Sequence, residues 1–147
     1  MNKKEFIQWF NELLLPLGYK RKGNVWELSG KELLKVIDLQ KSMYSSLYYV
    51  NYGYIITKLE LDGLLSHVNF RLHGKDRQEG DYIMELFDLD SGLDEHRRKE
   101  GVKEVLSGII FQMEKINTES ELLEYVIKKM PTKNAIPLCV IRYFDLT

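Results

Sequence analysis

Residues 31–54, KELLKVIDLQKSMYSSLYYVNYGY, decide the fold that the sequence predicts. Both halves of this stretch are rich in β-branched and aromatic residues, which favour strands, and a serine-containing segment separates them. Five of the nine tyrosines of the chain fall here. We therefore predict two long strands, 31–40 and 47–56, joined as a hairpin.

Shorter segments of the same character flank this hairpin. Residues 19–28 contain a Gly23-Asn24 turn signal between two short runs of strand formers, and residues 67–72 form another such run. Connections this short cannot make the crossovers that parallel strands require. The sequence therefore predicts an antiparallel meander of four or five strands.

Helices are predicted before and after the strands. Apolar residues recur at helical spacing in residues 6–17, where Pro16 ends the helix, and again in 102–116 and 122–130, while 81–87 is predicted as a short helix. Three pairs of residues match the capping box found at helix starts: Asn2 with Glu5, Ser91 with Asp94, and Thr118 with Glu121.

The C-terminal segment 135–144 is harder to assign. It is rich in β-branched and aromatic residues, but Pro137 restricts it to an edge strand or a short helix, and we favour the strand. The order of elements indicates a single α+β domain over residues 1–147. In this domain an N-terminal helix and two or three C-terminal helices pack on one face of the antiparallel sheet.

Composition narrows the class of protein. The 147 residues are 44% hydrophobic and 29% charged, as in globular domains, and the net charge of −1 argues against nucleic-acid binding. No apolar run approaches the ~18–20 residues of a membrane-spanning helix, and polar residues interrupt the N-terminal apolar segment, so no signal peptide is predicted. The single cysteine, Cys139, fits a reducing compartment, and we expect a cytoplasmic protein.

One face of the predicted sheet collects polar and aromatic side chains. Side chains alternate along a strand, so if helices cover the apolar set, the polar set faces outward. Gly53 would leave a depression in that polar surface. The binding residues that we predict there are Trp26, Asp38, Gln40, Tyr49, Asn51, Asn69 and Arg71.

Two interpretations of this face remain open. Antiparallel sheets often have one solvated face, and that alone would explain its polarity. Asn, Gln, Asp and Arg are nevertheless poor strand formers compared with Thr, so we hypothesise that Gln40, Asn51 and Arg71 contact a ligand or partner. An enzyme would instead use Asp38 as acid or base and Arg71 as an anion clamp, which requires the two side chains to converge.

Other motifs do not support catalysis, a metal or a cofactor. His67 and His73 would lie about 20 Å apart along one strand, too far to share a metal ion. Residues 88–94 imitate a calcium loop, but glycine occupies its fifth position and Lys99 its twelfth. Nucleophile-elbow, Walker and dinucleotide-binding patterns are absent from the sequence. We predict no catalytic residue, metal ligand or cofactor.

Three blocks of sequence resemble a known family. PLGYKRKGNVW at 16–26, VIDLQKS at 36–42 and YYVNYG at 48–53 resemble the bacterial family called domain of unknown function 4304. The resemblance covers the first helix and the strands, and it implies a small bacterial cytosolic protein. Its size is similar to that of immunity proteins that neutralise toxins, although this chain lacks their strong acidic excess.

These observations favour a function in binding. We expect a non-enzymatic protein-binding module, of an immunity or toxin-neutralising type, that uses the polar face of its sheet. An enzyme of unknown reaction, or a small-molecule-binding protein using the same face, is the alternative. The partner would be an unidentified protein or a small ligand, and the sequence favours no particular oligomeric state.

Overall fold

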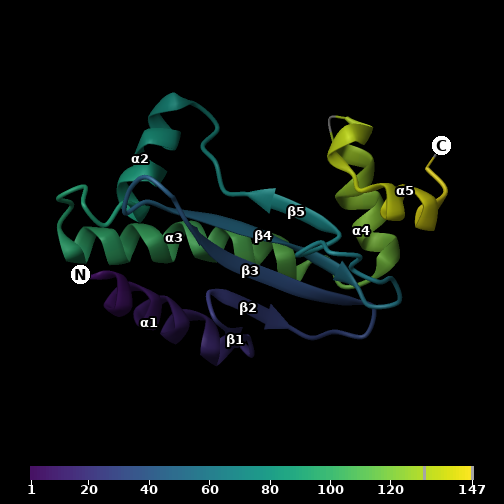
Figure 1. The fold of residues 1–147 in the computed structure, drawn as a ribbon, viewed down its shortest axis with the longest axis horizontal. Coiled ribbons are helices and arrows are strands. Elements are labelled where there is room, and N and C mark those ends of the chain that lie inside the picture. The colour runs from purple at the N-terminus through teal and green to yellow at the C-terminus, as the bar shows by residue number, and fades with distance from the viewer. Residues whose placement is uncertain (131, 147) are drawn as a thin grey trace.

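The computed structural model describes residues 1–130 and 132–146 and shows one antiparallel sheet flanked by helices (Figure 1). The five strands follow one another in sequence order across the sheet, which confirms the predicted meander. They are β1 (Lys20–Lys22), β2 (Val25–Leu28), β3 (Leu33–Lys41), β4 (Tyr48–Ile56) and β5 (Val68–Arg71). The long β3–β4 hairpin forms the centre of the sheet, as the stretch 31–54 predicts.

Helices precede and follow the sheet, and two of them end in short 3-10 turns. The α-helices are α1 (Lys3–Leu14), α2 (Arg77–Phe87), α3 (Glu95–Glu114), α4 (Glu119–Tyr125) and α5 (Leu138–Phe144). The 3-10 turns are η1 (Leu15–Leu17), η2 (Ile127–Lys129) and η3 (Lys133–Ala135). Among the described residues, no helix is both long and apolar enough to cross a membrane.

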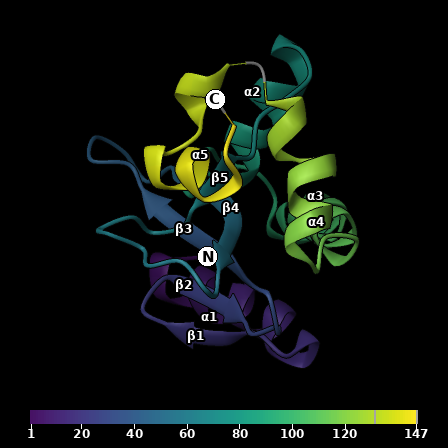
Figure 2. The ribbon, with the colours of Figure 1, turned by 90° about the vertical axis from the view of Figure 1, so that its right-hand side faces the viewer.

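The strand register divides the sheet into two faces. Ile37 lies opposite Trp26 on one side and Tyr52 on the other, and residues that pair directly point to the same face. This covered face contacts α1, where Phe10 packs edge-on against Trp26 at 5.0 Å between ring centroids. α3 runs along the same side of β3 and β4 (Figure 2). The opposite, polar face carries the exposed side chains of Gln40, Asn69 and Arg71.

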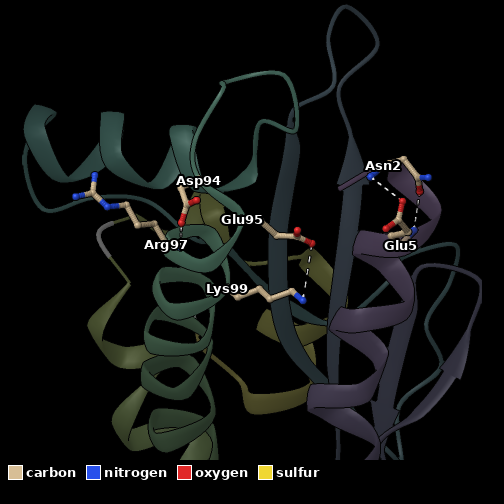
Figure 3. A network of polar contacts seen from close by, with 6 residues as sticks. All are labelled: Asn2, Glu5, Asp94, Glu95, Arg97 and Lys99. Carbon is tan, nitrogen blue, oxygen red and sulfur yellow. Dashed lines mark hydrogen bonds and ion pairs between the residues drawn. The ribbon is translucent and has the colours of Figure 1, made fainter.

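The helix starts follow the predicted caps, with one difference. Asn2 and Glu5 form a reciprocal capping box at α1, where the Glu5 amide donates to Asn2 Oδ1 at 2.9 Å. At α3 the cap is Asp94, whose carboxylate accepts from the Arg97 amide (Figure 3). Ser91, the cap that the sequence predicts, lies instead in the turn before the helix. The side-chain oxygen of an Asn, Ser or Asp cap accepts a hydrogen bond from a backbone amide of the first helical turn, which otherwise has no partner.

Arg98 shows that a run of charges is not always a solvated surface. Its side chain is 3% exposed, and its guanidinium donates to the carbonyls of Glu85, Leu86 and Asp88. These carbonyls lie at the C-terminal end of α2, where backbone acceptors lack helical partners. Arg98 therefore joins α3 to the end of α2, and the segment 88–94 is a helix-entry turn.

The C-terminal segment differs most from the prediction. Residues 138–144 form α5 and not the strand that we favoured. Pro137 is the residue before the first helical turn, where a missing amide costs nothing, and its carbonyl accepts from Val140 at 3.0 Å. The preceding helix is also shorter than its apolar pattern predicts, because α4 ends at Tyr125 and continues only as the 3-10 turn η2.

Candidate functional site

Four polar side chains from three adjacent strands form one hydrogen-bonded set on the polar face. Asn51, on the central strand β4, donates from Nδ2 to Gln40 Oε1 at 3.0 Å and to Asp38 Oδ2 at 3.3 Å. Its Oδ1 accepts from Arg71 Nε at 3.1 Å, and Arg71 Nη2 donates to Gln40 Oε1 at 2.7 Å. We call Asp38, Gln40, Asn51 and Arg71 the polar network.

The strand register explains why these four residues meet. Asp38 pairs with Asn51, and Asn51 pairs with Arg71, so three side chains lie in one row across β3, β4 and β5. Gln40 is two residues from Asp38 on the same face, which places it diagonally to Asn51. The alternation of side chains along each strand therefore predicts correctly that these four residues share one face of the sheet.

Asp38 lies at the inner end of the polar network. It is 8% exposed, and its Oδ1 accepts no hydrogen bond from the described residues. Burial raises the pKa of this carboxyl group, while the hydrogen bond from Asn51 and the positive charge of Arg71 oppose that shift. Asp38 is therefore a buried carboxyl group whose burial Asn51 and Arg71 compensate only in part.

Arg71 lies at the outer end of the polar network, where solvent reaches it. Its guanidinium carbon is 4.3 Å from the centre of the Tyr49 ring, which is a cation–π contact. Tyr49 pairs with Gln40, so the ring and the Gln40 amide hold the guanidinium from two sides. The arrangement presents an exposed cation in a fixed orientation.

Trp26 is wrongly placed in the sequence prediction. It is fully buried on the covered face, where its indole Nε1 donates to Asn11 Oδ1 of α1 at 2.9 Å. Side chains alternate within β2, so Val25, which pairs with Asp38, is the residue of that strand that faces the polar network. Trp26 packs the core and has no contact with the polar face.

Asn69 and Gly53 also differ from the simplest expectation. Asn69 lies on the polar face, exposed and paired with Gly53, but none of the hydrogen bonds in the polar network involves it. Gly53 is buried and leaves no depression, because a Cβ atom there would lie 2.0 Å from the Val68 carbonyl oxygen and 2.9 Å from Ser66 Oγ. The chain entering β5 fills that space, so glycine is required by close backbone approach.

One of the histidines, His67, has a structural role. His67 is fully buried, and its Nδ1 accepts a hydrogen bond from the Ile56 amide. Its Nε2 lies 2.8 Å from the Glu60 carbonyl oxygen. It thereby ties the end of β4 to the connection that follows. Among residues 1–130 and 132–146, no group of three or more histidine, cysteine, aspartate or glutamate side chains is placed to hold a metal ion.

One feature of the structure has no counterpart in the sequence prediction. A cavity of about 610 Å³ lies against the covered face, with Tyr52 and Phe70 on its sheet side and Lys129 on its helical side. Its walls come from β4, β5, α3 and the segment 121–130, which are far apart in the sequence. A periodicity pattern within one segment cannot predict a cavity of this kind, because its shape depends on how the segments pack.

Fold and site together define a small α+β domain that presents an ordered polar network on one face of a five-stranded sheet. The chain belongs to the family described as Domain of unknown function (DUF4304), whose model matches residues 10–116. The whole polar network lies within that matched segment. Searches of curated proteins and of solved structures found no match.

Proposed function

We propose that this protein is a non-enzymatic protein-binding module whose polar face is the contact surface. The observation that carries the proposal is the polar network, in which Arg71 is held by hydrogen bonds to Gln40 and Asn51 and by the Tyr49 ring. We expect a partner that buries this network in an interface of about 1,200–2,000 Å².

The physical basis is preorganisation. Arginine and tyrosine are enriched among the residues that contribute most to protein–protein binding. A long side chain normally loses rotamer freedom when it binds, at a cost of about 0.5–1.5 kcal/mol. Arg71 has already lost much of that freedom in the free protein, because three neighbours on rigid strands fix its position. Its guanidinium fork fits a carboxylate, so an acidic patch on the partner is the expected complement.

Surface shape favours a protein over a small ligand at this face. Asp38, Gln40 and Asn51 line none of five cavities on the described part of the surface, whereas Arg71 lies with Tyr49 at the edge of one of about 290 Å³. Small-molecule and catalytic sites are usually concave, whereas protein contact surfaces are not. Asp38 and Arg71 do converge through Asn51, as an enzyme would require, but a binding role better suits a network of which three members lie outside these cavities.

The more specific form of the proposal is a toxin-neutralising protein of the bacterial cytoplasm. The small size of the chain and its single cysteine support this form, and a toxin with an acidic surface would then be the partner. The same experiment tests the broad and the specific form, because it identifies the partner.

The test is quantitative co-purification from the native host with a matched pair of variants. Gln40→Ala with Arg71→Ala removes the exposed part of the polar network, and Arg97→Ala removes an exposed arginine of α3, away from the polar face, as the control. We expect a partner that is recovered with the wild type and the control and is lost with the double variant. Melting temperatures of all three proteins establish that they are folded. Equal recovery of every associated protein by the double variant would refute the proposal.

A further inference from the structure

The aromatic cavity on the covered face is a second candidate binding site, separate from the polar network. We give this name to the cavity of about 610 Å³ described above. Its sheet side is formed by Tyr52 and Phe70, whose rings stack at 5.6 Å and 28°, together with the buried Tyr54. Val126 and Met130 line it from the helical side. The volume lies within the range of about 300–1,000 Å³ that is usual for small-molecule sites.

The exposure of the lining residues shows where a ligand would enter. Tyr54 and Ile116 are buried and form the inner wall, whereas Tyr125 and Lys129 are exposed. The inner part is apolar and aromatic, and the charged groups lie toward solvent. A ligand that matches this arrangement has an apolar body and a polar group at one end.

The charges at the cavity favour a negative group at that end. The Lys115 ammonium lies 4.1 Å from the centre of the Phe111 ring, and the Lys129 ammonium lies 5.4 Å from that of Tyr125. Among the described residues, the ion pairs formed by lysine involve Lys99 and Lys128, so neither of these two ammonium groups is neutralised by a carboxylate. Contacts between exposed cations and aromatic rings are weaker than charge-assisted hydrogen bonds, so an anion can displace them.

The acidic residue of the lining does not cancel these two cations. Glu121 Oε1 accepts from the amides of Asn117 and Thr118, both at 3.1 Å, and so its carboxylate caps the start of α4. Burial raises the pKa of both Tyr52 and Tyr54, so their phenols remain neutral near pH 7 and add no negative charge. The lining therefore has a positive excess.

We propose that the aromatic cavity binds a small amphipathic carboxylate, with its apolar chain against Tyr52 and Phe70 and its carboxylate between Lys115 and Lys129. A chain of about ten carbon atoms is suited to a site of this size. This site lies on the face of the sheet opposite to the polar network, so the proposal does not depend on the proposed function.

The test is isothermal titration calorimetry with decanoate below its micellar concentration, and with decanol and decyltrimethylammonium as neutral and cationic ligands of equal chain length. We expect decanoate to bind most tightly. Lys115→Gln with Lys129→Gln should weaken decanoate binding by about tenfold or more, because the charge-assisted contacts are lost. Lys128→Gln is the matched control, since Lys128 pairs with Glu124 on the surface, and it should bind as the wild type does.

Two further variants locate the site. Val126→Trp should fill the cavity and abolish decanoate binding, with the melting temperature measured to establish folding. Arg71→Ala, on the polar face, should leave decanoate binding unchanged. Decanol binding as tightly as decanoate, unchanged affinity in the double lysine variant or in Val126→Trp, or no binding of any of the three ligands would each overturn the proposal.

Discussion

Arg71 on β5 donates a hydrogen bond of 2.7 Å to Gln40 on β3, although β4 lies between these two strands. Neighbouring strands are about 4.8 Å apart, so the contact reaches over two strand spacings. Asn51 lies beneath it on β4 and bonds to both side chains. The contact therefore exists only when three strands are paired in the correct register.

The buried carboxyl group of Asp38 gives the first prediction. Burial raises the pKa of this group in the folded state, so the folded protein holds the proton more tightly than the unfolded chain does. The stability that this difference contributes is fully present at low pH. That stability is lost as the pH rises through the folded pKa. Asp38→Asn removes the charge and retains an oxygen that can accept from Asn51. We expect the variant to be more stable than the wild type at pH 7 by about 1 kcal/mol, the size of a typical single-substitution effect, because it buries no charge.

The measurement for Asp38 is urea unfolding at several pH values. The stability difference between Asp38→Asn and the wild type should grow as the pH rises from about 4 to about 7, through the range in which a carboxyl group of raised pKa ionises. Asp81→Asn, at an exposed carboxylate, is the control. A difference that is constant over this range would show that the Asp38 charge has no effect on folding.

The indole of Trp26 gives the second prediction. Its N–H group is buried and donates to Asn11 of α1, so Asn11→Ala leaves a buried donor without that acceptor. We expect the free energy of unfolding to fall by about 1–3 kcal/mol. Gln8→Ala, at an exposed position of the same helix, should change it by less than about 0.5 kcal/mol. Equal effects of the two substitutions would contradict the contact.

Two glycines, one in a crowded position and one in open space, give the third prediction. Gly53→Ala forces a methyl group against the Val68 carbonyl oxygen, whereas Gly108, in α3, has open space around its Cα. We expect Gly53→Ala to destabilise the protein by about 3 kcal/mol or more, because backbone must move. Gly108→Ala should stabilise it by up to about 1 kcal/mol through helix propensity. Thermal and urea unfolding of both variants check this, and a tolerated Gly53→Ala would show that the strands have room there.

The neighbours Arg97 and Arg98 give the fourth prediction. Arg98→Ala leaves the carbonyls of Glu85, Leu86 and Asp88 without their buried donor, and we expect a loss of about 3 kcal/mol in the free energy of unfolding. Arg97 is exposed, and its alanine variant should lie within about 0.5 kcal/mol of the wild type. Urea unfolding measures both. Comparable losses in the two variants would argue against a special role for Arg98 at the end of α2.

Local patterns in the sequence predict the fold and part of the candidate site. Alternation along three strands correctly places Asp38, Asn51 and Arg71 on one face, because the side-chain period in a strand is fixed at two. Alternation within a strand does not say which residue of β2 pairs with which residue of β3. The sequence prediction therefore places Trp26 on the wrong face, whereas Val25 is the residue that lies beside Asp38.

Features that depend on packing could not be predicted in the same way. Arg98 lies within a run of charged residues and looks exposed, yet the end of α2 surrounds it. The aromatic cavity combines residues of β4 and β5 with Lys129, which follows Phe70 of β5 by nearly sixty residues. Pro137 is compatible with an edge strand and with a helix start, and only the contacts of residues 138–144 decide between them.

Site-specific photo-crosslinking in the native host tests the central claim, that the polar face contacts a protein partner, most directly. A photoreactive phenylalanine derivative is placed at Asn69, which is exposed on the polar face, and in a separate protein at Phe111, which is exposed on α3. We expect a discrete crosslinked adduct from position 69 that is absent from position 111 and is lost when Gln40→Ala and Arg71→Ala are added. No adduct at position 69, or the same adduct at both positions, would contradict it.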